Sequence, residues 1–170
     1  MSVLPDPEIF IGLSALGLTV TGFSGLVAVL GRRATGSWTD RDRLQLEQLL
    51  ELSIAVTFAS LIPVLVSVAT DSVAALSVAT VLVAVFHFII MARGFLKIVS
   101  RKAASIDLPR YLSVTFFVGG AVLITGAIAS GLGYIEWAAL FLLSNIVWLL
   151  IVALTHFVIL LMNPIGSHQA

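Results

Sequence analysis

The sequence has no cysteine and few charged residues. Of its 170 residues only 11% are Asp, Glu, Lys or Arg, against about 25% in ordinary soluble domains. The missing cysteines exclude a disulfide-stapled module and any thiolate metal site. Lys and Arg together number nine, as do Asp and Glu, so the formal net charge is zero. This balance argues against a nucleic-acid-binding protein, which needs a basic surface.

Apolar side chains are what the chain has in abundance. Hydrophobic residues make up 59% of the sequence, and the mean hydropathy is +1.13. If it folded in water, a chain this short would have too little interior to bury so much apolar surface. The composition therefore excludes a soluble globular domain and predicts an integral membrane protein whose surroundings include the lipid bilayer.

Long apolar runs predict the number of membrane spans. A hydrocarbon core of about 30 Å takes about 20 helical residues to cross. Five stretches reach that length, and none has a charged residue in its central turns. The runs are apolar on all sides, which favours helices over alternating strands. We therefore expect an all-α integral membrane protein with a single domain of five transmembrane helices. The expected spans are 9–30, 49–69, 73–92, 112–132 and 137–162.

Basic residues are confined to two connections, between the first and second spans and between the third and fourth. The other two connections carry only acids, at Asp71 and Glu136. Because basic loops stay in the cytoplasm, this pattern predicts an N-terminus outside and a C-terminus in the cytoplasm. The short loops and the absence of an N-x-S/T glycosylation acceptor favour a bacterial inner membrane.

Two histidines lie inside the expected spans at matching depths. His87 lies five residues before the end of the third span, and His156 lies six before the end of the fifth. At 1.5 Å per residue, both are about 8–9 Å from the cytoplasmic boundary. Such a pair is the minimum geometry for the two axial ligands of haem b, and it also suits a proton or ion relay. The simplest interpretation needs no cofactor: each ring is hydrogen-bonded to hydroxyl groups on neighbouring helices.

Two further polar residues belong to this candidate intramembrane site. Asn145 falls on the same helical face as His156 and has an amide that needs partners. Glu51 lies about half a turn inside the second span, where Arg33 or Arg93 is an expected neighbour, or His87 if the carboxylate lies one turn deeper. We predict that this face of the fifth span meets other helices and not lipid.

Residues 22–25 spell Gly-Phe-Ser-Gly, a G-x-S-G pattern that resembles the nucleophile motif of rhomboid proteases. The resemblance implies a Ser–His dyad built on Ser24, which lies at the depth of both histidines. The chain differs from that family, whose members have six or more spans and cleave their substrates near the opposite face of the membrane. The pattern also coincides with a stripe of small residues, so a serine hydrolase is a remote alternative.

Small and hydroxylated residues form stripes on the expected first and second spans. Small residues allow membrane helices to approach closely, which makes helix packing the first interpretation. The alternative is that the same hydroxyl groups line a polar pore. The residues concerned are Ser14, Gly17, Thr21, Ser53, Thr57 and Ser60.

The third span is followed by a basic stripe. Arg93, Lys97 and Arg101 recur at four-residue steps, and Lys102 comes next. This pattern is typical of a helix end that lies in water on the cytoplasmic side, where basic residues are concentrated. It also predicts contact with anionic lipid headgroups.

Short matches suggest that the hairpin of spans two and three is repeated as spans four and five. His87-Phe88-Ile89-Ile90, for example, corresponds to residues 156–159, His-Phe-Val-Ile. Such a repeat would be related by an axis along the membrane normal. It would place the two histidines at equivalent positions.

The functional expectation follows mostly from what the chain lacks. There is no room for an extramembrane domain, no charge at the midplane and no convincing catalytic set. We expect a non-enzymatic subunit that self-associates or docks on a larger membrane complex, with no nucleic-acid partner. The first alternative is an oligomeric channel or transporter for a small solute or ion, and the second is a haem-b electron carrier.

Overall fold

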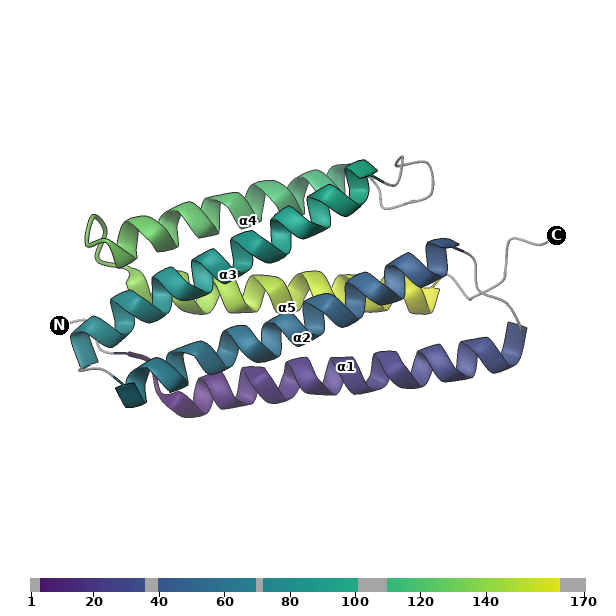
Figure 1. Ribbon diagram of the computed structural model, residues 1–170, viewed down its shortest axis with the longest axis horizontal. Helices are drawn as coiled ribbons and strands as arrows, with labels where there is room; N and C mark the ends of the chain where they lie inside the picture. Colours follow the sequence, from purple (N-terminus) through teal and green to yellow (C-terminus); the bar gives the residue numbers. More distant parts are fainter. Residues whose placement is uncertain (1–3, 36–39, 70–71, 101–109, 163–170) are drawn as a thin grey trace.

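The computed structural model describes residues 4–35, 40–69, 72–100 and 110–162, and these residues are helical almost throughout. Five helices run in alternating directions along one long axis (Figure 1). Each is long and apolar enough to cross a membrane, which confirms the expected all-helical, multi-pass architecture. The helices are α1 (Pro7–Thr35), α2 (Asp40–Ala69), α3 (Ser72–Ser100), α4 (Arg110–Gly131) and α5 (Ala138–Met162).

Polar and glycine residues at the helix ends set these boundaries. The backbone N–H of Glu8 donates to Asp6 Oδ1 at 3.0 Å, so Asp6 caps the first turn of α1. After α4, Gly133 has a φ of 85°, and the Tyr134 N–H donates to the Ala129 carbonyl at 2.9 Å. This is a Schellman motif, which favours glycine at the left-handed position.

Two helices extend well beyond the expected spans. The span expected at 49–69 belongs to a helix that begins at Asp40, and the span expected at 73–92 belongs to a helix that ends at Ser100. Both extensions lie at the same end of the bundle, which we call the basic end. Charged side chains are compatible with helical backbone there because they pair across the two helices, as described below.

The centre of the bundle consists of α3 and α5. In each of these spans 39% of the residues are buried, against 17% in α1. Helix α5 contacts all four other helices, whereas α1 packs on α2 and touches α5. Figure 1 shows α1 along one side of the molecule and α4 along the other, with α3 and α5 between them. The hairpins α2–α3 and α4–α5 therefore form a four-helix unit to which α1 is added.

Glycines allow the closest approaches between helices. A Cβ atom on Gly17 would lie 2.8 Å from Thr57 Oγ1 and 2.9 Å from the Ser53 carbonyl oxygen, so α1 lies directly against α2. On α4, a Cβ on Gly126 would lie 2.2 Å from the Phe141 ring. The small-residue stripes are thus occupied by packing inside one chain.

Candidate functional site

A cavity of about 110 Å³ lies between α2, α3, α4 and α5, in the half of the bundle nearest the basic end. On a comparable measure one water takes about 10–15 Å³, so the cavity has room for several waters or one small molecule. Its wall combines apolar and aromatic side chains with a few polar ones, as is typical of ligand sites in helical bundles. The polar lining residues are Gln48, Glu51, His87, Ser113, Trp148 and His156.

Asn145 fixes the orientation and tautomer of His87. The Asn145 Nδ2 group donates to the Leu123 carbonyl at 3.1 Å and to the Phe141 carbonyl at 2.8 Å. Its Oδ1 lies 2.7 Å from His87 Nδ1 and can only accept, so the ring proton is on Nδ1. The neutral imidazole therefore has its lone pair on Nε2. That atom lies 3.4 Å from where a Cβ on Gly120 would stand.

His156 repeats this arrangement on α5. Its Nδ1 lies 2.9 Å from the Val152 carbonyl oxygen, which also only accepts. The lone pair of this ring is therefore on Nε2 as well. Neither Nε2 atom has a hydrogen-bond partner within the described ranges. The cavity thus has two imidazole rings whose free acceptors are not used by the fold.

Aromatic rings complete the wall. Phe116 of α4 stacks on His156 with ring centroids 6.3 Å apart and an interplanar angle of 30°. Phe116 also meets Trp148 edge to face, at 6.3 Å and 80°. The Trp148 Nε1 atom lies 3.7 Å from the Cβ position of Gly120, the same position that lies close to His87 Nε2. Met91 Sδ lies 3.1 Å from the same position, so a side chain at Gly120 would crowd Met91 beside these two nitrogen atoms.

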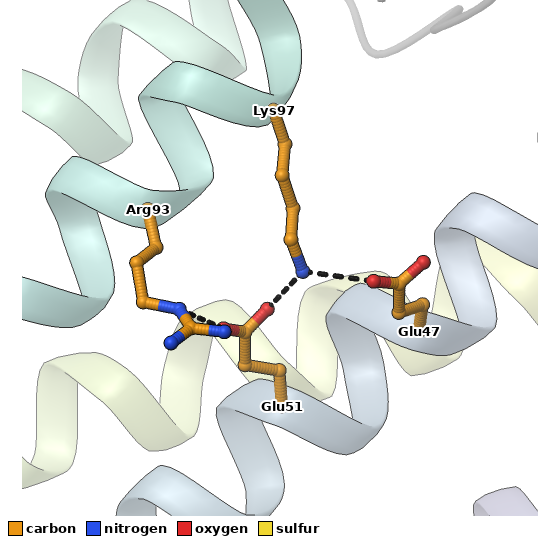
Figure 2. Close-up of polar contacts among 4 residues, drawn as sticks. All are labelled: Glu47, Glu51, Arg93 and Lys97. Atoms are coloured by element: carbon orange, nitrogen blue, oxygen red, sulfur yellow. Dashed lines mark hydrogen bonds and ion pairs between the residues drawn. The ribbon is translucent and has the colours of Figure 1, made fainter.

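An ion-pair network lies at the basic end of the cavity (Figure 2). Arg93 Nε and Glu51 Oε1 are 3.0 Å apart, and Lys97 Nζ is 3.0 Å from Glu47 Oε1. Lys97 also pairs with Glu51 Oε2. Two acids of α2 thus meet two bases of α3, and their formal charges cancel. Glu51 belongs both to this network and to the cavity wall, so the network borders the cavity.

The structure brings Glu51, His87 and His156 to one cavity, with Asn145 behind His87. Ser24 is elsewhere: it is fully buried in α1, its Oγ donates to the Val20 carbonyl at 2.6 Å, and it does not line the cavity. The Ser–His dyad implied by the rhomboid resemblance therefore gains no support from this arrangement.

The hydroxylated stripes lie on α1 and α2, where Gly17 meets Ser53 and Thr57. Their hydroxyl groups donate to carbonyls four residues earlier in their own helices, as serine and threonine do inside membranes. Ser14 of the same stripe is partly exposed. The hydroxyl groups bonded in this way belong to Thr21, Ser53, Thr57 and Ser60.

The basic stripe is described only in part. Arg93 and Lys97 pair with acids of α2, while Arg101 and Lys102 lie outside the described residues. The Arg93 side chain is 63% exposed at the end of its span. Contact with lipid headgroups therefore stays a prediction.

The haem-b alternative gains no support from this arrangement and stays a prediction. The cavity measures about 110 Å³, whereas even drug-sized ligands occupy sites of about 300–1,000 Å³. His87 and His156 have the tautomer that iron ligation needs, but the space between the helices is filled by side chains such as Phe116 and Trp148.

Sequence reasoning missed the contribution of α4. Ser113, Phe116 and Phe117 line the cavity, yet nothing in their pattern separates them from lipid-facing neighbours. Met91 was missed for the same reason. Gln48 carried a signal, because it is a polar residue one turn from Glu51 on the same helix.

Comparison with protein-family models, with curated proteins and with solved structures gives no match to this chain.

Proposed function

We propose that this protein is a non-enzymatic membrane protein that binds a small, partly polar solute in the cavity between α2, α3, α4 and α5. The observation that carries the proposal is the pair of unpaired Nε2 atoms, on His87 and His156, in one cavity of about 110 Å³. Polar groups inside membrane spans are rare and mark substrate or ion pathways. A fold that needed these rings for packing alone would gain nothing from leaving both acceptors open.

We further propose that the solute enters from the cytoplasm. We place the mouth of the cavity at the ion-pair network of Glu47, Glu51, Arg93 and Lys97, because Glu51 of that network also lines the cavity. The positive-inside rule assigns that end to the cytoplasmic side. The Glu51 side chain is 22% exposed and also lines the cavity, so a solute at the mouth meets it first.

Solute binding fits the residues better than the other expected functions. Self-association stays a prediction, because Gly17 is used in packing within the chain whereas Gly12 and Gly22 of the same helix lie open. A pore along the first two helices would need accessible hydroxyl groups, whereas Ser53 and Ser60 of α2 are fully buried within the chain. Docking on a larger complex stays a prediction, and it is compatible with a solute-binding subunit.

The test uses the absence of native cysteine. Val152 lines the cavity, so Val152→Cys places one thiol on its wall. In inside-out vesicles, a small water-soluble thiosulfonate is expected to label this thiol. Adding Gly94→Leu is expected to slow the labelling, because Gly94 lines the cavity and a Cβ there meets nothing within 4 Å.

Two matched variants control the experiment. Val83→Cys places the thiol in the closed core of α3, where the valine is 0% exposed. Gly22→Leu adds the same bulk as Gly94→Leu at another open glycine, on α1. If Val152→Cys reacts no faster than Val83→Cys, or reacts only from the opposite side of the membrane, the proposal is wrong.

A further inference from the structure

We infer that the cavity selects small uncharged molecules that combine an aromatic ring with a hydroxyl group, the phenol class. This inference rests on the proposed solute-binding function and names the chemistry of the solute. It follows from three properties of the wall: which hydrogen-bonding groups are open, how the charges are paired, and which surfaces face the cavity.

The unpaired hydrogen-bonding groups in the cavity wall are acceptors, so a bound solute must supply a hydrogen-bond donor. His87 Nδ1 donates to Asn145 Oδ1 and His156 Nδ1 donates to the Val152 carbonyl, so each ring has only its Nε2 lone pair left. A lone pair in an apolar wall is satisfied only by a group that carries a hydrogen. The hydroxyl group of a phenol satisfies one of the two lone pairs, whereas a ketone, an ether or a hydrocarbon satisfies neither.

The paired charges favour an uncharged molecule. Glu51 is held by both Arg93 and Lys97, so its carboxylate is already compensated and gives a ligand cation little net attraction. The two bases are engaged in the same way, which gives an anion little attraction. Because moving an uncompensated charge out of water is costly, a charged solute would enter without a partner to offset that cost.

The remaining wall suits a flat ring. Phe116, Phe117 and Trp148 face the cavity together with apolar side chains such as Leu149. Aromatic rings gain from edge-to-face and offset contacts beyond simple burial. A single six-membered ring is also of the size that a cavity of about 110 Å³ accepts.

The experiment uses Trp148 as the reporter. The chain has three tryptophans, and Trp38→Phe with Trp137→Phe leaves Trp148 alone. Its fluorescence is titrated with phenol and with toluene, which has the same shape but no donor, at matched concentrations in the detergent micelle. One net hydrogen bond corresponds to about a tenfold tighter binding of phenol. Gly94→Leu is expected to weaken both ligands, and Gly22→Leu neither.

Removing the acceptors tests the assignment. In the double variant His87→Phe, His156→Phe, phenol is expected to bind no better than toluene. If that variant does not fold, the ratio of phenol affinity to toluene affinity in the protein with both histidines decides by itself whether binding requires a donor. Equal binding of the two ligands, blocked by Gly94→Leu, would overturn the donor requirement and leave the solute site standing. Absence of a response to either ligand would overturn the inference, while the cysteine labelling judges the site independently.

Discussion

At the scale of single residues, the geometry of the site depends most on the Asn145 side chain. Its amide donates to carbonyls of α4 and α5, and its oxygen accepts from His87 of α3. One fully buried side chain therefore joins three helices. It also determines that Nε2 is the His87 nitrogen left without a partner in the described part of the chain.

Replacing this residue tests its structural role. Asn145→Leu leaves the His87 Nδ1–H without its acceptor, and a buried unpaired donor costs about 1–3 kcal/mol. We expect a loss of that size in unfolding free energy, measured by chemical unfolding in detergent. Thr125→Val is the matched control, because Thr125 is exposed and donates only to its own helix. Equal loss in the two variants would contradict the account.

The sequence indicated much of this site, but not its internal geometry. His87, His156, Asn145 and Glu51 stand out because polar residues are rare in apolar spans. Which of them touch depends on helix rotation and on side chains from α4, and apolar residues such as Phe116 carry no signal of rotation. The pairing of His87 with Asn145 therefore had to come from the structure.

At the scale of helices, the contact between α1 and α2 depends on Gly17. A Cβ there would lie 2.9 Å from the Ser53 carbonyl oxygen, a backbone atom that cannot rotate away. Gly12 lies on the same helix, and a Cβ there meets nothing within 4 Å.

The same substitution by alanine at Gly17 and at Gly12 compares a close contact with an open position. Gly17→Ala is expected to destabilise the protein by about 1–3 kcal/mol, the usual cost of overpacking. Gly12→Ala is expected to be neutral or slightly stabilising, because alanine favours helix. The midpoints of thermal unfolding in the same detergent compare the two. If Gly12→Ala is as damaging as Gly17→Ala, the close approach of α1 to α2 is wrong.

Helix number was predictable from the sequence, and so was the early start of α2, since Thr39 and Asp42 have the spacing of a helix-capping box ahead of the second span. Apolar runs of about 20 residues follow directly from bilayer thickness, and the structure has a helix at each one. The additional turns of α2 and α3 are charged and carry no hydropathy signal. They are held by pairing between Glu47, Glu51, Arg93 and Lys97, a contact between residues more than 40 positions apart in the chain.

At the scale of the whole molecule, the route by which a solute enters depends on which side of the membrane the basic end faces. The distribution of Lys and Arg over the connections predicts a cytoplasmic basic end and C-terminus. A fluorescent protein that matures only in the cytoplasm, fused after Ala170, is expected to fluoresce. Alkaline phosphatase at the same position is expected to be inactive. The reverse pair of results would place the mouth of the cavity outside.

The proposed site depends on the two ring nitrogens of His87 and His156 that have no partner in the described residues. His168→Gln leaves His87 and His156 as the remaining histidines, and ¹⁵N NMR of the labelled protein in bilayers then reports which nitrogens carry hydrogen. We expect hydrogen on Nδ1 and a bare Nε2 on both rings, with the Nε2 signals shifting when phenol is added. Hydrogen on Nε2 of either ring, with Nδ1 bare, would contradict this expectation.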